Sequence, residues 1–309
     1  MRDEVYLRLE ASIQKRERIA IIQKNEKVRV KRVFLSFLET GSPFLWRLAY
    51  RFAPWLPIRW VKTSIFTGHK LILPFRDKRT HEINRFGIEG PDCEIRLARH
   101  YIQTLNKNSV FFDIGANFGY FTAIGEVSGA RVSAFEANEK LCELLRKNFS
   151  GEETDIVNAL IAKDDGRDAD FYLVSGNEGR STANAEIATQ LTGHGMFLRK
   201  SVMQTMSMDT YVEHTQRIPT HIKIDVEGGE YEVLRGMEGI LRRYEPEIVI
   251  EVWGGDQFEF SKDAIMFLES FGYMPFVIAK AGLRSTTLDE ISQMRESHDN
   301  IAFLKTQNI

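Results

Sequence analysis

The alternation of apolar and polar residues is clearest in the middle of the chain. Residues 110–112 form an apolar run that ends at Asp113, and a glycine- and asparagine-containing segment then leads to apolar residues Phe121, Ile124 and Val127. A short apolar run bounded by turn residues is typical of a buried strand, and apolar residues three apart indicate a helix. The pattern therefore predicts a strand, a tight turn and a helix.

The same strand and helix patterns alternate to the end of the chain. Further strands are predicted at 130–137, 154–162, 220–228, 247–253, 274–280 and 300–305, and helices at 94–105, 139–149, 230–244 and 262–272. This alternation predicts an α/β fold with a doubly wound, mostly parallel, seven-stranded sheet and helices on both faces. The last two strands lack a full helical crossover between them, which predicts an antiparallel hairpin at one edge.

The chain divides by pattern into two regions. Residues 1–90 read as a basic, mainly helical region with a short strand at 70–75, and 91–309 as the main domain. One insertion, 175–208, is polar, rich in glycine and weakly periodic. Long insertions in compact domains are often functional, so it is predicted either to form a flap over the site or to be a surface loop without a role.

Composition limits the class of protein. The chain has 309 residues, is 43% hydrophobic and 27% charged, and carries a net charge of −2, as soluble globular proteins do. Cys93 and Cys142 stand apart, which disfavours a zinc site or a disulfide framework and favours a reducing, cytoplasmic setting. Arginines and prolines interrupt the apolar stretch 43–61, so it is not expected to span a membrane.

Charge is distributed unevenly along the chain. Residues 1–62, called here the basic arm, hold fourteen basic and six acidic residues, with Trp46, Phe52, Trp55 and Trp60 among the arginines. Such an arm could contact an anionic membrane surface peripherally, or meet a pyrophosphate-linked substrate or nucleic acid. The favoured interpretation is a helical extension whose arginine stems cover apolar surface of the main domain. A nucleic-acid partner is disfavoured.

The turn after residue 112 carries candidate binding chemistry. It contains Asp113, Gly115, Asn117 and Gly119, which is not the glycine spacing of a dinucleotide site. Glycine lets a ligand approach the backbone, and an acid in the turn repels a pyrophosphate but suits an ammonium group. The next strand ends at Glu136, where a carboxylate can accept hydrogen bonds from two ribose hydroxyls. An amino-acid end and a ribose describe S-adenosylmethionine better than NAD.

At these residues the chain resembles the FkbM-type methyltransferases, a family of class I, Rossmann-like, S-adenosylmethionine-dependent enzymes that often O-methylate sugars or secondary metabolites. The motifs are DIGANFGYFTA, AFEAN, SMD at 207–209, IKIDVEGGEYEVLRG and EIVIEV, and they cover roughly 110–252. Two departures are Ala137, where the family has proline, and Met208, where it has leucine. The resemblance implies cofactor-binding roles for Asp113, Gly115, Ala116, Asn117, Gly119, Glu136, Ala137, Asn158, Ala159 and Leu160. The alternative for Asp113 and Glu136 is that each caps a following helix.

Residues on the next two strands are candidates for the chemistry. Asp225 ends one strand and Glu227 follows it, Lys223 shares a strand face with Asp225, and Glu251 lies near the end of the neighbouring strand. A carboxylate could position an acceptor hydroxyl or take its proton. Glu227 could instead cap the next helix, and Lys223 could steer an anionic acceptor or only pair with a carboxylate. His221 and His194 are interpreted as structural and inert, respectively.

The same carboxylates allow two catalytic hypotheses, one metal-dependent and one metal-free. Asp225, Glu227 and Glu251 are oxygen donors that could converge on Mg²⁺, but metal-free catalysis is the simpler hypothesis. The function expected is O-methylation of a sugar, glycan or secondary-metabolite hydroxyl. The alternatives are N-methylation of a small molecule, a nicotinamide-dependent oxidoreductase, and a non-catalytic membrane-surface adaptor using the basic arm. The identity of the acceptor and the oligomeric state are left open by the sequence.

Overall fold

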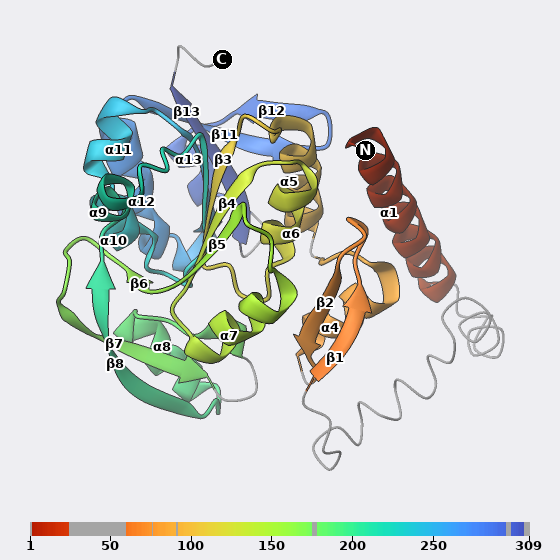
Figure 1. Cartoon of the computed structure of the whole chain (residues 1–309), viewed down its shortest axis with the longest axis horizontal. Helices are drawn as coiled ribbons and strands as arrows, with labels where there is room; N and C mark the ends of the chain where they lie inside the picture. The colour runs from red at the N-terminus through yellow and green to blue at the C-terminus, as the bar shows by residue number, and fades with distance from the viewer. Residues whose placement is uncertain are drawn as a thin grey trace. The chain divides into compact units, whose positions relative to one another are not determined.

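The computed structural model describes residues 2–24, 60–75, 77–90, 92–174, 178–294 and 298–305. These residues belong to two compact units, Met1–Ile95 and Arg96–Ile309, which are coloured from red to orange and from yellow to blue in Figure 1. The division after residue 90 that the pattern suggests stays a prediction.

The first unit combines helices with a small hairpin. Helix α1 spans Arg2–Lys24, strands β1 (Trp60–Ser64) and β2 (Lys70–Pro74) pair antiparallel, and helix α4 spans Lys78–Phe86. The strand predicted at 70–75 is therefore present as β2. The carboxylate of Asp77 accepts a hydrogen bond from the backbone N–H of Arg79 and so caps α4, a role typical of aspartate at a helix start.

Most of the basic arm lies outside the described residues. This applies to residues 25–59, which include Trp46, Phe52 and Trp55. Trp60 opens β1 and is 44% exposed. Of the helices that the structure describes, none has the length and apolar character needed to cross a bilayer.

The second unit is built on an eight-stranded sheet of order β12-β11-β13-β10-β9-β3-β4-β5. Its strands are β3 (Val110–Ile114), β4 (Arg131–Glu136), β5 (Thr154–Asn158), β9 (His221–Ile224), β10 (Glu247–Trp253), β11 (Tyr273–Ala279), β12 (Gly282–Ser285) and β13 (His298–Lys305). The five strands from β10 to β5 pair in parallel. The doubly wound, mostly parallel α/β sheet predicted from the sequence is confirmed.

Two details of the sheet differ from the prediction. The last two predicted strands, β11 and β13, do pair antiparallel, but β13 inserts between β11 and β10 rather than standing at the edge. The edge is β12, an eighth strand whose four residues are all exposed. A fully exposed strand has no buried face, so no apolar alternation marks it in the sequence.

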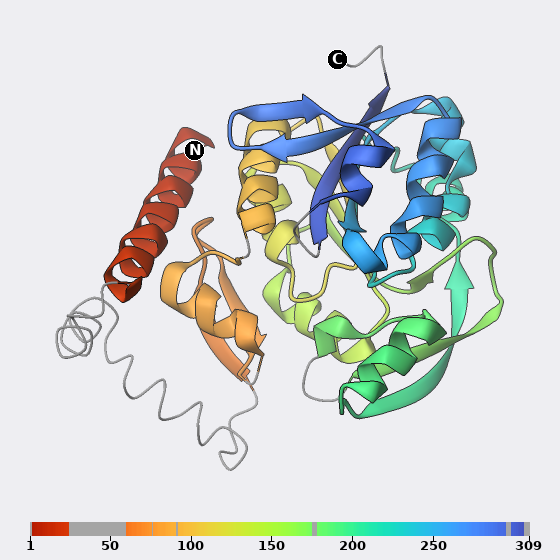
Figure 2. The ribbon, with the colours of Figure 1, turned by 180° about the vertical axis from the view of Figure 1, so that it is seen from behind.

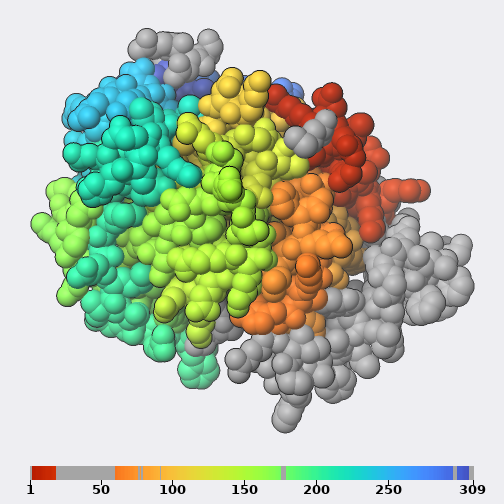
Figure 3. Space-filling view, in the orientation of Figure 1, coloured from red at the N-terminus to blue at the C-terminus, as the bar shows by residue number. Residues whose placement is uncertain are grey.

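Helices cover both faces of this sheet. Along the chain, β3 and β4 alternate with three helices: α5 (Asp92–Thr104), α6 (Tyr120–Val127) and α7 (Glu139–Asn148). In the same way, β9 and β10 alternate with four helices: α9 (Met208–Thr215), α10 (Glu230–Arg235), α11 (Glu238–Arg243) and α12 (Glu259–Ser270). In Figure 1, α5 and α6 lie to the right of the sheet and α9 to α12 to its left. A short helix α13 (Leu288–Ser292) precedes β13. Figure 3 shows yellow-green residues of the region that contains α7 and β5 at the surface, as expected for an edge strand.

The sheet interior is apolar on both faces because its central strands are covered by helices. All five residues of β3 are buried. The core beneath α9 to α12 includes Phe112, Ile222, Ile224, Ile248, Ile250, Val233, Leu234, Ile265 and Leu268. Near-continuous apolar strands are typical of parallel sheets buried on both sides.

The insertion 175–208 contains regular structure in its described part. Strand β8 (Leu198–Met206) pairs antiparallel with β7 (Asp168–Val174) and in parallel with β6 (Leu160–Ile161), and helix α8 (Ala185–Gly193) lies against β7, as Figure 2 shows. The sequence did not predict β7 or β8. Val202 of β8 is 61% exposed, so the apolar residues of β8 do not mark a buried face.

The Ser-Met-Asp motif joins two helices. The hydroxyl of Ser207 accepts a hydrogen bond from the N–H of Thr210 and caps α9. The carboxylate of Asp209 accepts hydrogen bonds from the N–H groups of Gly239 (2.8 Å) and Ile240 (2.9 Å) at the start of α11. This motif therefore stabilises the packing of α9 against α11.

We expect Asp209→Ala to lower the free energy of unfolding by about 2 kcal/mol, because two N–H groups at a helix start lose their acceptor. Urea denaturation measures this change. Asp263→Ala on the exposed face of α12 is the matched control and should change stability by less than about 0.5 kcal/mol. Equal effects of the two substitutions would contradict the capping role.

Candidate active site

The predicted site residues come together because of the register of the four central parallel strands. Ile114 of β3 pairs with Phe135 of β4 and with Ile224 of β9, and Ile224 pairs with Ile250 of β10. The next residue on each strand therefore stands in a single row at the carboxyl edge of the sheet: Glu136, Gly115, Asp225 and Glu251. This edge is where open α/β sheets bind ligands. We call these four residues the edge row.

Two glycines in the turn after β3 are required by close packing within the protein. Gly115 has φ +80°, and a Cβ there would lie 1.8 Å from the carbonyl oxygen of Asp225. Gly119 has φ +89°, and its Cβ would lie 2.2 Å from the Phe149 ring. The sequence analysis attributed these glycines to close approach by a ligand, but the space at these two positions is filled by the protein's own atoms.

Asp113 lies at the buried base of this turn, with 1% of its surface exposed. Its Oδ2 accepts a hydrogen bond from the Thr122 hydroxyl at 2.7 Å, and its Oδ1 lies 3.8 Å from Nζ of Lys223. Burial raises the pKa of Asp113, and the Lys223 ammonium opposes that rise. The Oδ1 atoms of Asp113 and Asn117 are both buried and accept no hydrogen bond from the described residues. The turn therefore holds two buried acceptor oxygens to which no described residue donates a hydrogen bond.

Glu136 is held by the backbone at both oxygens. Its Oε2 accepts a hydrogen bond from the N–H of Asn117 (2.9 Å), and its Oε1 from the N–H of Asn138 (2.7 Å). Burial raises the pKa of Glu136 to about 7, and the two N–H groups oppose the rise. The capping alternative is wrong for Glu136, because the residue that caps α7 is Asn138. Asp113 is not the N-cap residue of α6 either, because Gly119 occupies that position, but Asp113 does contact the first turn of α6 through Thr122.

The remaining predicted cofactor residues surround the end of β4. The side-chain amide of Asn158 donates to the backbone carbonyl oxygens of Glu136 (2.8 Å) and Ala137 (3.1 Å). The N–H of Ala159 also donates to the backbone carbonyl of Glu136, at 3.3 Å. Leu160 is buried at the start of β6. Ala116 is also buried, and its N–H donates to the carbonyl of Phe135. The structure therefore brings the predicted set together.

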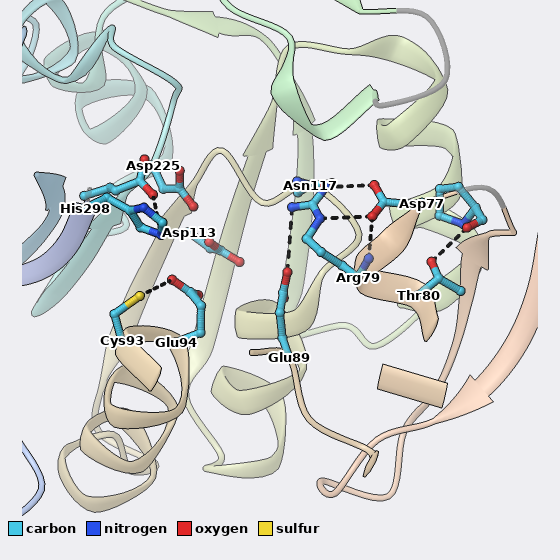
Figure 4. Close-up of polar contacts among 12 residues, drawn as sticks. Asp77, Arg79, Thr80, Glu89, Cys93, Glu94, Asp113, Asn117, Asp225 and His298 are labelled. Carbon is cyan, nitrogen blue, oxygen red and sulfur yellow. Dashed lines mark hydrogen bonds and ion pairs between the residues drawn. The ribbon is translucent and has the colours of Figure 1, made fainter. Parts of the chain in front are cut away.

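Lys223 is a buried cation between two carboxylates. Its side chain is 3% exposed, and its Nζ lies 3.0 Å from Oδ2 of Asp225 and 3.8 Å from Oδ1 of Asp113. The ammonium also lies 5.1 Å from the centre of the Phe121 ring. Of the two alternatives for Lys223, the geometry favours pairing with carboxylates over steering an anionic acceptor. Asp113 and Asp225 are labelled in Figure 4.

The loop after β9 has a left-handed turn at Glu227, whose φ is +54°. Glu227 does not cap α10, because Gly229 occupies the cap position without a side-chain hydrogen bond. Glu230 shapes the loop instead: its Oε1 accepts hydrogen bonds from the N–H groups of Val226 (3.0 Å) and Gly228 (3.3 Å). The sequence analysis missed this role, although Glu230 belongs to the motif that it quoted.

The insertion is fastened to this loop. The Thr182 hydroxyl donates to the carbonyl of Glu227 at 2.7 Å, and the Asn184 amide donates to the carbonyl of Gly228 at 3.2 Å. Gly228 is packed so closely on Ile187 that a Cβ there would lie 2.1 Å from it. An apolar cluster formed by the end of β7 and the insertion also packs against Trp253 at the end of β10; its buried members are Val174, Ile187 and Leu191. The insertion therefore forms a wall beside the edge row.

Glu251 ends the row on β10. Its Oε2 accepts a hydrogen bond from Nε1 of Trp253 at 2.9 Å, and its Oε1 lies 4.0 Å from Nε2 of His298 on β13. Burial raises the pKa of Glu251 well above its usual range, and Asp225 and Glu227 raise it further. No pattern in the sequence marks Trp253 or His298 as a site residue. Only the antiparallel return of β13 brings His298 beside Glu251.

Neither His221 nor His194 belongs to the edge row. His221 stands at the opposite end of β9 and contacts the Thr220 hydroxyl at 2.8 Å, and His194 is exposed at the end of α8. Within the described ranges, no group of three or more histidine, cysteine, aspartate or glutamate side chains has a geometry that could hold a metal ion. The Mg²⁺ hypothesis therefore gains no support from these residues.

Comparison with known proteins connects this site to a family. The model of the methyltransferase FkbM domain matches residues 113–275, a span that contains the whole edge row. No curated protein matches the chain.

Three solved structures are among those to which this chain is similar. The methyltransferase FkbM from Methylobacillus flagellatus is 16% identical over 65% of this chain and 44% of its own, with a TM-score of 0.39. This chain therefore spans less than half of that protein. A precorrin-6y C5,15-methyltransferase from Geobacter metallireducens is 16% identical over 69% and 88% of the two chains, with a TM-score of 0.37. Trm5b from Pyrococcus abyssi is 11% identical over 80% of this chain and 56% of its own, with a TM-score of 0.42.

We expect Glu230→Gln to stabilise the protein above pH 7 and not below about pH 4.5. Burial raises the pKa of Glu230 to about 7 from 4.5, so the folded state binds the proton more tightly and the free energy of unfolding falls as pH rises through this window. Glutamine keeps the acceptor oxygen without the charge. The gain at pH 8 should be up to about 3 kcal/mol.

Urea denaturation at pH 4, 6 and 8 measures this gain. Glu232→Gln, on the exposed side of the same helix, is the control and should show no such pH dependence. Parallel stability curves for Glu230→Gln and the wild type would contradict the interpretation.

Proposed function

Because this chain belongs to the methyltransferase FkbM domain family, we propose that it is an S-adenosylmethionine-dependent methyltransferase. The proposed reaction is O-methylation of a hydroxyl group on a small molecule, either a sugar or glycan or a secondary metabolite. The observation that carries the proposal is the edge row, with acceptors for a ribose at one end and a group of carboxylates at the other.

The proposed cofactor side is the half of the row on β3 and β4. Each Glu136 oxygen accepts one backbone N–H group, and a carboxylate oxygen can accept a second hydrogen bond. Glu136 would therefore bind the ribose hydroxyls without rearrangement. The buried Oδ1 atoms of Asp113 and Asn117 would accept hydrogen bonds from the ammonium of the methionyl group.

The rest of the predicted cofactor set would complete this side of the site. Gly115, Ala116 and Gly119 would shape the turn around the methionyl group, and Ala137 and 158–160 would lie towards the adenine. These assignments rest on the positions of these residues around the ends of β3 and β4.

The proposed acceptor side is the half of the row on β9 and β10. When bound, the cofactor supplies an electrophilic methyl group on a cationic sulfur. Asp225, which Lys223 holds at 3.0 Å, would position the acceptor hydroxyl, and Glu227 and Glu251 would line the same place. Such a group of carboxylates attracts a sulfonium and repels a pyrophosphate, which argues against the nicotinamide-dependent alternative.

Acceptor specificity is proposed to lie in the wall formed by the insertion and Trp253. The insertion contacts the carbonyl of Glu227 in the loop that follows Asp225, and Trp253 contacts Glu251 of the row itself. Peripheral contact between the basic arm and an anionic membrane stays a prediction, since residues 25–59 are not described.

Calorimetry with S-adenosylhomocysteine and with NAD tests the cofactor assignment, and tritium transfer from labelled S-adenosylmethionine into glycan and metabolite extracts tests the reaction. We expect binding of S-adenosylhomocysteine alone and label in a hydroxyl-bearing product. Binding of NAD alone, or label found only on nitrogen, would contradict the proposal.

Glu136→Gln should weaken S-adenosylhomocysteine binding by roughly 10²-fold, because a charged acceptor of two ribose hydroxyls is lost. Since the pKa of Glu136 is about 7 and the ionised form is the better acceptor, affinity in the wild type should rise as pH rises from 6 to 8, by roughly tenfold. The variant should lose this rise. Glu139→Gln, exposed in the first turn of α7, is the calorimetric control and should behave as the wild type.

Asp225→Asn should leave S-adenosylhomocysteine affinity nearly unchanged and lower tritium transfer by roughly 10²-fold, because the positioning carboxylate loses its charge. Loss of affinity in parallel with transfer would instead make Asp225 a cofactor ligand.

A further inference from the structure

We propose that Glu251, backed by His298, takes the proton of the acceptor hydroxyl, and that it does so because the positive charge on the donor sulfur disappears in the same step. This inference deepens the function proposed above and rests on it. It assigns a role to His298, and it separates the role of Glu251 from that of Asp225.

Asp225 is poorly placed to be the base, because Lys223 already neutralises it. The Lys223 ammonium donates to Oδ2 of Asp225 at 3.0 Å, and Lys223 is itself buried. The Oδ2 atom of Asp225 is thus already occupied by the hydrogen bond from Lys223. Asp225 is therefore suited to hold a hydroxyl by hydrogen bonding, and less suited to accept its proton.

Glu251 has the opposite surroundings on the neighbouring strand. Among the described residues, no lysine or arginine forms an ion pair with Glu251. The imidazole of His298 lies 4.0 Å from its Oε1 atom and forms an ion pair only when it is protonated. The indole N–H of Trp253 fixes Oε2, which leaves Oε1 on the side of His298. The His298 side chain, which is labelled in Figure 4, is 35% exposed and therefore links the surroundings of Glu251 to solvent.

The groups around Glu251 make its proton affinity depend on the bound ligand. Facing it are Asp225 and Glu227 after β9, Glu230 of α10, Trp253 of its own strand and His298 of β13. Burial and the three carboxylates favour the protonated form of Glu251. A sulfonium bound at the edge row would favour the ionised form, whereas the neutral thioether of the product would not.

The bonds and charges of the step balance. The acceptor oxygen forms the new C–O bond, the C–S bond breaks with its electron pair left on sulfur, and the O–H proton moves to Oε1 of Glu251. The site starts with a cationic sulfur and an ionised Glu251, and it ends with a neutral sulfur and a protonated Glu251. The carboxylate is thus ionised before transfer and becomes a stronger base as transfer proceeds.

Proton counting during ligand binding tests this inference without any acceptor. Calorimetric titration of S-adenosylmethionine and of S-adenosylhomocysteine, each in PIPES and in Tris at several pH values from 6 to 8, gives the number of protons released by each ligand. We expect the wild type to release more protons with the sulfonium ligand than with the thioether. We also expect its preference for the sulfonium ligand to increase with pH, on the order of tenfold across the range.

Glu251→Gln should abolish both differences, because glutamine keeps the acceptor for Trp253 but does not titrate. His298→Gln should keep the difference in proton release but move it to higher pH. Glu269→Gln, exposed on α12, is the control and should match the wild type. Thermal melting of each variant checks that it is folded.

Three results would overturn the inference: equal proton release by the two ligands in the wild type, a difference that survives in Glu251→Gln, or an unchanged pH profile in His298→Gln. The failure of the proposed function looks different, since neither ligand would then bind to the wild type at all.

Discussion

Parallel pairing of β4, β3, β9 and β10 in one register is the constraint on which the rest of the structure depends. It places Glu136, Gly115, Asp225 and Glu251 side by side at one edge of the sheet. At about 4.8 Å between neighbouring strands, the row spans about 14 Å from Glu136 to Glu251. Residues that are over 100 positions apart in the sequence thereby form one continuous surface.

Placing several carboxylates at one edge of the sheet costs free energy because the charges repel one another and lose hydration. Each carboxylate is stabilised by different partners. Glu136 and Glu230 each accept two backbone N–H groups, whereas Asp113 and Asp225 share Lys223. Glu251 has the indole of Trp253 and a more distant imidazole. Because buried charges need either a partner or a proton, these different surroundings give chemically similar side chains different roles.

The sequence predicted the sheet and the residues of the row well, because both follow from local patterns. Apolar runs ending at Asp113, Glu136 and Asp225 mark the central strands and their carboxyl ends together. What it missed depends on contacts between distant segments. His298 reaches Glu251 only because β13 returns antiparallel, and Thr182 of the insertion contacts Glu227 through a backbone carbonyl that no residue type reveals. The two glycines of the turn were found correctly but for a different reason, since their neighbours are protein atoms.

The central claim is that the edge row binds an adenosyl amino acid in one orientation. A crystal structure of the protein with S-adenosylhomocysteine tests it most directly. The account predicts both ribose hydroxyls within hydrogen-bond distance of Glu136, the amino group at the Oδ1 atoms of Asp113 and Asn117, and the sulfur facing Asp225 and Glu251. A ligand bound elsewhere, or bound with its ribose away from Glu136, would contradict it.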